Sequence, residues 1–219
     1  MQTLTAAFAA LSGSLRDQAP APVLASIDES LAALARSGLM DRSLRGGDLA
    51  PDFALPGATG AMVELRQLLS RGPLVLSFYR GAWCPYCNLE LHAWQRHLPE
   101  LERLGATLVA ISPQTPDASL TLAEKHALAY PVLSDRGNVV ARRFGIVYTV
   151  DERMRAVLEG FGVHLSAYNG DSTFELPVPA TFLVAKDATI VGAWIDADYR
   201  RRAEPSAVLD RVRAMVGPK

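Results

Sequence analysis

The sequence predicts an α/β fold in which helices flank a mixed central sheet. From Asp48 onward, strand-like and helix-like segments alternate along the chain. Residues 73–79, PLVLSFY, form a continuous apolar run with β-branched and aromatic members, as a buried central strand requires. Near the C-terminus, the apolar segments 180–185 and 189–195 form a hairpin pattern around Lys186 and Asp187. A hairpin adds antiparallel strands to an otherwise parallel sheet, so we expect the sheet to be mixed.

The N-terminal part of the chain has a different pattern. Residues 3–37 show apolar positions at helical spacing, interrupted by Pro and Ala at 19–22, and the Gly-rich stretch 37–52 resembles a linker. We therefore expect a helical N-terminal extension at 1–45 and an α/β domain at 46–219. Two short amphipathic helices cannot bury their apolar faces alone. They should pack on the same chain or form a homodimer, and the pattern does not separate these two.

The elements of the α/β domain follow one another in order. We expect short strands at 51–55 and 61–65, the central strand, a long helix at 85–104, a strand at 106–112, a helix at 119–128, a strand at 131–135, a helix at 139–145, the hairpin, and a closing helix at 206–216. Residues 147–178 interrupt the alternation and contain a polar stretch. We interpret them as an insertion with one helix at 151–161.

Composition excludes several classes of protein. With 219 residues, 49% hydrophobic and 21% charged, the chain is neither disordered, nor collagen-like, nor a coiled coil. Its formal net charge of -1 gives no indication of a nucleic-acid partner, and no apolar run approaches the ~20 residues of a membrane-spanning helix. The N-terminus lacks the basic start of a secretory signal, and two cysteines do not make a secreted disulfide scaffold. We therefore expect a soluble, cytoplasmic protein.

The two cysteines form one motif, Trp83-Cys84-Pro85-Tyr86-Cys87, directly after the central strand and at the start of the long helix. At such a junction, unpaired backbone N–H groups and the helix dipole stabilise a thiolate and lower the thiol pKa. Pro85 suits the first helical turn, where its missing N–H would have no partner. Cys87 lies one turn from Cys84, so the pair can close a disulfide with little movement.

Two other interpretations of the pair compete with redox chemistry. A structural zinc site needs four ligands, and the nearby His92 and His97 lie further along the helix, away from its N-terminus. Two inert buried thiols are the second alternative. A CxxC pair after a strand in an α/β chain favours redox chemistry over both. Because no Gly-rich phosphate loop occupies the strand-to-helix turn, no nucleotide or flavin cofactor is expected. For want of further ligands near the two cysteines, no metal is expected either.

Five segments, in order, are similar to those of a known family. They are 47–69, 73–91, 111–119, 131–145 and 179–194. Together they resemble the peroxiredoxin-like branch of the alkyl hydroperoxide reductase/thiol-specific antioxidant group, over roughly 46–217. The resemblance implies a thioredoxin-like fold and reduction of hydrogen peroxide or organic hydroperoxides. It also implies recycling by thioredoxin or a similar dithiol.

The chain departs from the family pattern at two places. Where typical members carry Pro, Thr and the peroxidatic Cys, this sequence has Arg80, Cys84 and Cys87. In this register Cys87 matches the peroxidatic cysteine. Where the family carries an Arg before the TFL strand, this chain has Pro179, which resembles the cis-proline of thioredoxin-type oxidoreductases. In those enzymes the first Cys of the motif attacks, so the attacking thiol stays open between Cys84 and Cys87.

Four further residues are candidates for the site. Arg80 could supply positive charge to the leaving oxygen, or be an ordinary surface arginine. Tyr79 and Trp83 are expected to wall the thiol pocket, although aromatic residues at a strand end are often core. Pro179 could lie over the cysteines in a cis-proline loop, or be a turn proline. The basic segment 198–205 is expected to be a solvated face or a docking edge for the dithiol donor.

The leading hypothesis is thus a thiol peroxidase that forms an intramolecular disulfide. A thioredoxin-like thiol–disulfide oxidoreductase is the alternative favoured by Pro179 and the missing Thr. A non-enzymatic redox sensor is the third, and slow oxidation without turnover by any dithiol would identify it.

Overall fold

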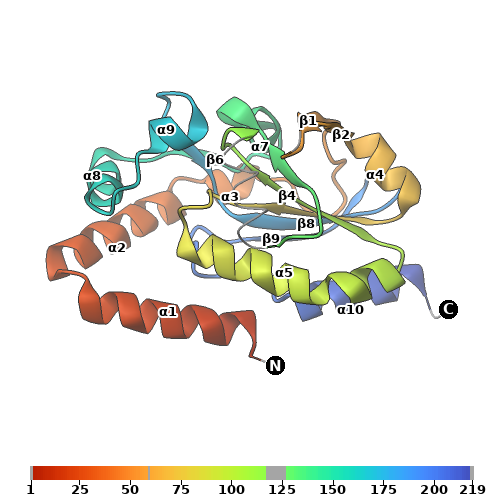
Figure 1. Ribbon diagram of the computed structural model, residues 1–219, viewed down its shortest axis with the longest axis horizontal. Helices are drawn as coiled ribbons and strands as arrows, with labels where there is room; N and C mark the ends of the chain where they lie inside the picture. Colours follow the sequence, from red (N-terminus) through yellow and green to blue (C-terminus); the bar gives the residue numbers. More distant parts are fainter. Residues whose placement is uncertain (1, 59, 117–126, 218–219) are drawn as a thin grey trace.

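The computed structural model describes residues 2–58, 60–116 and 127–217 and shows a five-stranded mixed sheet between helical layers (Figure 1). The strands are β1 (Ala54–Pro56), β2 (Met62–Glu64), β3 (Leu74–Phe78), β4 (Thr107–Ser112), β5 (Val132–Ser134), β6 (Val147–Thr149), β7 (Glu175–Pro177), β8 (Ala180–Val184) and β9 (Ile190–Ile195). The helices are α1 (Leu4–Gln18), α2 (Ala21–Arg36), α3 (Leu39–Arg42), α4 (Leu65–Arg71), α5 (Pro85–Arg103), the 3₁₀ turn η1 (Arg136–Asn138), α7 (Val139–Arg143), α8 (Glu152–Gly160), α9 (Leu165–Asn169) and α10 (Pro205–Val216). The predicted mixed sheet flanked by helices is confirmed.

The central sheet has the order β5-β4-β3-β8-β9. β4 runs parallel to β3 and to β5, whereas β8 is antiparallel to both β3 and β9. All five residues of β3 are buried, which agrees with its uninterrupted apolar sequence. The predicted hairpin of β8 and β9 therefore supplies the antiparallel strands. β1 and β2 pair with each other in a separate ribbon, as do β6 and β7.

Alternate residues of β3 point into two different cores. Val75 packs in the core beneath α5 and α10, which also contains both cysteines. Leu74, Leu76 and Phe78 pack in the core on the other face, with residues of α4 and α7. The CxxC motif thus belongs to the face covered by α5, α10 and α1.

The two N-terminal helices pack on their own chain. α1 lies along α5, and α2 continues from it towards α8 (Figure 1). Leu4 and Phe8 of α1 are buried, and the backbone N–H groups of Leu4 and Thr5 donate to the carboxylate of Glu204. Of the two predicted arrangements, packing on the same chain is observed. Dimerisation through these helices stays a prediction, as does the division of the chain at 45/46.

Several short elements were not predicted. α3 and α4 have four and seven residues, too few for a helical period to stand out. The segment 147–178 contains α9 and the β6–β7 ribbon besides the expected helix, so the prediction of one helix was wrong. Residues 119–126 of the expected helix at 119–128 lie outside the described residues. Among the helices described, none is long and apolar enough to cross a membrane.

Candidate active site

The site lies where β3 gives way to α5. Cys84 caps the N-terminus of α5, and its sulfur accepts a hydrogen bond from the backbone N–H of Cys87 at 3.4 Å. Pro85 is the first helical residue, as predicted. Both cysteines are reduced and fully buried. The sequence therefore folds as expected here, with one thiol at the helix cap and the other in the first turn.

The loop before Cys84 is held by two side-chain hydrogen bonds. The backbone N–H of Ala82 donates to Oε1 of Gln114 at 2.6 Å, and Nδ2 of Asn88 donates to the carbonyl of Ala82 at 2.9 Å. Gly81 adopts φ +154°, and a Cβ there would lie 2.4 Å from Nε1 of Trp83. A glycine at this position lets the Trp83 side chain lie against the loop.

Arg80 is directed at the first thiol. Its Nη2 lies 3.0 Å from Sγ of Cys84, and the residue is only 5% exposed. The guanidinium stacks 3.8 Å above the ring of Tyr199 and 5.1 Å from that of Trp83. The alternative of an ordinary surface arginine is therefore wrong. A buried guanidinium in this position favours negative charge on the Cys84 sulfur.

The second thiol has its own arginine, which sequence reasoning missed. Nη2 of Arg202 lies 3.7 Å from Sγ of Cys87, and Nη1 forms an ion pair with the carboxylate of Glu90. Both of these charged side chains are almost wholly buried, at 2% and 1% exposure. The predicted solvated face at 198–205 was thus wrong for Arg202, although Arg201 is exposed. Glu90 lies one helical turn after Cys87, a spacing that could have indicated it.

The two thiols differ in acidity. Burial alone would raise the pKa of Cys84, but a hydrogen bond from the Cys87 side chain and the charges of Arg80 and Arg202 outweigh it, so this pKa lies well below its usual value. For Cys87, burial, the hydrogen bond to Cys84 and the negative charge on that sulfur raise the pKa well above its usual value. The arrangement is therefore a Cys84 thiolate beside a Cys87 thiol.

Glu90 is the other titratable group of the site. Burial raises the pKa of its carboxyl to about 7, although Arg202 acts in the opposite direction. A carboxyl of this acidity, one turn from Cys87, can exchange a proton near neutral pH.

Three further residues were predicted to lie at the site: Pro179, Tyr79 and Trp83. Their surroundings in the structure differ. None of the described residues has a cis peptide bond, so the expected cis-proline at Pro179 was wrong. Pro179 is nevertheless buried beside the end of β3, because Phe78 pairs with Ala180 in the register of β3 and β8. Tyr79 is fully buried in the same core as both cysteines, and half-buried Trp83 packs against that core. Both aromatic residues therefore belong to or pack on the core that holds the thiols, and their role as walls of a substrate pocket stays a prediction.

No group of three or more His, Cys, Asp or Glu that could hold a metal ion occurs among the residues described. The charged groups nearest to the two thiols are Arg80 and Arg202, with Glu90 paired to the latter. The site thus offers thiol, guanidinium and carboxyl chemistry.

The AhpC/TSA family matches residues 46–193 of this chain. Peroxiredoxin Bcp of Escherichia coli K12 is 33% identical over 103 residues, which are 47% of this chain and 65% of that protein. The thiol-disulfide oxidoreductase ResA of Halalkalibacterium halodurans is 31% identical over 108 residues, 48% of this chain and 60% of that protein. The matched segments thus span somewhat less than two thirds of these relatives.

Solved structures give the same fold. Peroxidoxin BcpB from Mycobacterium tuberculosis superposes with a TM-score of 0.63 at 26% identity, covering 78% of this chain and 98% of that one. Peroxiredoxin Q from Xanthomonas campestris gives a TM-score of 0.58 at 21% identity, covering 75% and 92%. The predicted thioredoxin-like fold is confirmed. The family match begins at residue 46, so α1 and α2 lie outside it.

Proposed function

Since this chain belongs to the AhpC/TSA family, we propose that it is a thiol peroxidase that reduces hydroperoxides with the Cys84–Cys87 pair. The observation that carries the proposal is the contact of 3.0 Å between Arg80 and the buried sulfur of Cys84. A guanidinium there stabilises the attacking thiolate. It also stabilises the negative charge that develops on the leaving oxygen when the O–O bond breaks.

In the proposed reaction Cys84 attacks, because its pKa is the lower of the two. The thiolate attacks the distal oxygen of ROOH, an S–O bond forms and the O–O bond breaks, which leaves Cys84 sulfenic acid and RO⁻. RO⁻ takes up a proton and departs as an alcohol, or as water if R is hydrogen. The sulfur has been oxidised by two electrons and the peroxide reduced by two.

Cys87 then resolves the intermediate. Its thiol gives up a proton, and its sulfur displaces hydroxide from the sulfenic acid to form the Cys84–Cys87 disulfide; the hydroxide takes up a proton and leaves as water. Glu90, with a pKa of about 7, is positioned one turn away as a proton acceptor for this step. Thioredoxin or a similar dithiol returns the pair to the reduced state by exchange, and is itself oxidised to a disulfide.

Two serine variants test the order of the thiols. Cys84→Ser and Cys87→Ser should each abolish turnover with hydrogen peroxide and a recycling dithiol, because each removes half of the disulfide. After one equivalent of hydrogen peroxide, Cys87→Ser should give a dimedone adduct on Cys84, measured by mass spectrometry. Cys84→Ser should give none, and the reduced wild type should end as the disulfide.

Two other outcomes would contradict either the order of the thiols or the peroxidase function itself. An adduct on Cys87 in the Cys84→Ser variant would assign the attack to Cys87, as the family register suggests. No adduct in either variant would rule out a peroxidase.

A thiol–disulfide oxidoreductase is the second candidate function. It is favoured by the lowered pKa of the first Cys of the motif and by the similarity to the oxidoreductase ResA. Peroxide oxidation no faster than that of free cysteine, together with fast reduction of a protein disulfide, would support it over the peroxidase.

A further inference from the structure

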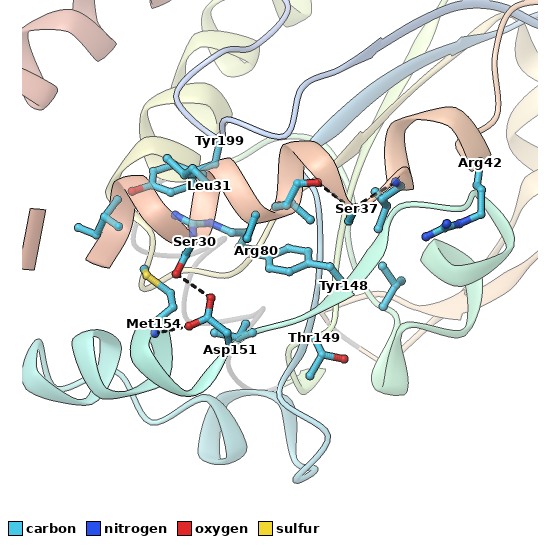
Figure 2. A pocket seen from close by; sticks show the side chains of 16 residues that line it. Ser30, Leu31, Ser37, Arg42, Arg80, Tyr148, Thr149, Asp151, Met154 and Tyr199 are labelled. Carbon is cyan, nitrogen blue, oxygen red and sulfur yellow. Dashed lines mark hydrogen bonds between the residues drawn. The ribbon is translucent and has the colours of Figure 1, made fainter. Parts of the chain in front are cut away.

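A cavity of about 360 Å³ lies between α2 and the β6–α8 segment and reaches Arg80 (Figure 2). Leu31 and Leu34 line it from α2, and Val147 and Met154 line it from the opposite wall. Figure 2 shows Arg80 between these two walls. Cavities of roughly 300–1,000 Å³ with apolar walls are the usual size for binding a small organic molecule.

The inner end of the cavity is chemically connected to the thiol. Arg80 lines the cavity and donates to Sγ of Cys84 at 3.0 Å, so one guanidinium contacts both. Its Nε–H is buried and has no hydrogen-bond partner among the described residues. A guanidinium carries five N–H donors, and a buried donor without a partner is costly. With five donors, the guanidinium as a whole can bind a polar group at the inner end of the cavity while it contacts Cys84.

The wall formed by α2 is fixed by polar contacts. Oγ of Ser30 donates to Asp151 at 2.6 Å, and Glu29 forms an ion pair with Arg153 of α8. Asp28 lies 3.5 Å from Arg200, in the loop that also carries Tyr199. α2 has no fully buried residue, so its position depends on these contacts and on its half-buried apolar side. The cavity is thus a preformed site, and its α2 wall lies outside the part of the chain that matches the family.

We propose that this cavity binds the apolar tail of an organic hydroperoxide, and that α2 is the wall that makes the site selective for such a tail. The inference rests on the proposed peroxidase function. The hydroperoxide group lies at Arg80, whose guanidinium lines the cavity and also contacts the Cys84 sulfur. The alkyl or aryl tail lies between Leu31, Leu34, Val147 and Met154. Attack by Cys84 then releases the corresponding alcohol, as in the reaction above.

The lining carries three charged side chains, Arg42, Arg80 and Asp151, among apolar ones. Asp151 is part of the lining and remains ionised, because its hydrogen bonds and Arg153 hold its pKa below the usual range despite partial burial. Hydrogen peroxide has no tail, so water still covers the apolar walls when it binds. The walls therefore add nothing to its binding energy. An apolar tail adds binding energy that hydrogen peroxide cannot obtain.

Two substitutions on α2 test this inference. Ala33 lines the cavity at an exposed position, whereas Ala35 is exposed and does not line it. Ala33→Phe should narrow the cavity, and Ala35→Phe places the same ring on the same helix away from it. The measurement is kcat/KM for cumene hydroperoxide and for hydrogen peroxide, with thioredoxin recycling. We expect the ratio of the two to fall at least about tenfold in Ala33→Phe and to keep its wild-type value in Ala35→Phe.

The outcomes separate the inference from the function. A ratio that is equal in wild type and Ala33→Phe, or that falls equally in both variants, would overturn the inference and leave the peroxidase in place. A wild type that turns over neither peroxide would overturn the proposed function, and the inference with it. Met154→Phe fills the cavity from the opposite wall, so it should lower the same ratio even if Ala33→Phe disturbs α2. Far-UV circular dichroism checks that each variant is folded.

Discussion

Arg80 and Arg202 come from distant parts of the sequence, yet each faces one thiol of a single helical turn. Arg202 is paired with Glu90, whereas the Arg80 guanidinium contacts the Cys84 sulfur, the rings of Trp83 and Tyr199 and the side chain of Tyr148, none of which is a carboxylate. The thiolate is therefore the natural counter-ion of Arg80. This explains why the proton is lost from Cys84, and not from Cys87.

Arg80→Gln should raise the pKa of Cys84. The thiolate is measured by its absorbance at 240 nm against pH, in a Cys87→Ser background. In the parent, Cys84 stays ionised at pH values well below the usual thiol pKa. The rate at which peroxide oxidises it should therefore fall only at low pH. Without the guanidinium less offsets the effect of burial, so the pKa of Cys84 rises, and the thiolate fraction at pH 7 should fall by about tenfold or more.

Arg201→Gln is the matched control, because Arg201 is exposed and its ion pair with Asp196 is 3.7 Å long. It should leave the Cys84 titration as in the parent. If Cys84 titrated at the same pH in Arg80→Gln as in the parent, the role given to the guanidinium would be contradicted.

Sequence alone could identify the residues of the motif but not those brought to it. Cys84, Cys87 and Arg80 adjoin one strand and one helix, so local rules place them. Arg202 and Tyr199 come from a loop more than a hundred residues later, and their burial depends on how the sheet brings that loop to α5. Proline isomerism at Pro179 was equally beyond local pattern, because only ~5–6% of X–Pro bonds are cis and position before a strand does not select them.

At the scale of elements, α1 seals the site from one side. Phe8 packs edge-on against Tyr86 at 5.3 Å between ring centroids, and Ser12 hydrogen-bonds to the Tyr86 hydroxyl at 2.8 Å. Tyr86 lies within the CxxC motif, so α1 covers the residue between the two thiols. A protein dithiol that approached Cys84 from this side would have to displace α1.

Phe8→Ala should loosen α1 and expose the thiols. Removing a buried phenylalanine ring costs about 3–5 kcal/mol, and part of this cost disappears if α1 detaches. Reaction of the reduced protein with an aromatic disulfide reagent, followed by absorbance, should therefore be up to about 100-fold faster than in wild type. Phe161→Ala removes a ring that is 57% exposed and should react at the wild-type rate. Equal rates in all three proteins would mean that α1 does not control access.

An element could be predicted when it is long enough to show a repeating pattern of apolar residues. α1, α2, α5 and α10 are twelve residues or longer and show several apolar repeats, so their bounds were predicted to within a few residues. α3, α4 and α9 are too short to repeat. Which wall α2 would form could not be predicted either, because its contacts with α8 are polar pairs between surface residues.

For the molecule as a whole, the two redox states should differ in how firmly the N-terminal helices are held. In the reduced protein the Cys84 thiolate neutralises buried Arg80. A Cys84–Cys87 disulfide carries no charge, so Arg80 loses its anion while Arg202 keeps Glu90. Leaving one member of a buried ion pair without its partner typically costs about 3–5 kcal/mol. The nearest way for the guanidinium to regain water is through the cavity that it lines, between α2 and α8.

Oxidation should therefore loosen that side of the molecule. Backbone hydrogen exchange measured by mass spectrometry should become at least about tenfold faster in α2 and in residues 147–160 after one equivalent of hydrogen peroxide. α10, on the sheet face under α5, should exchange equally in both states and serves as the internal reference. In Arg80→Gln, which has no buried guanidinium to release, the difference between the two states should vanish. Equal hydrogen exchange of wild-type α2 in the reduced and oxidised states would contradict this prediction. The charge lost by Cys84 would then be compensated within the closed site, and access of the reductant would have to depend on α1 alone.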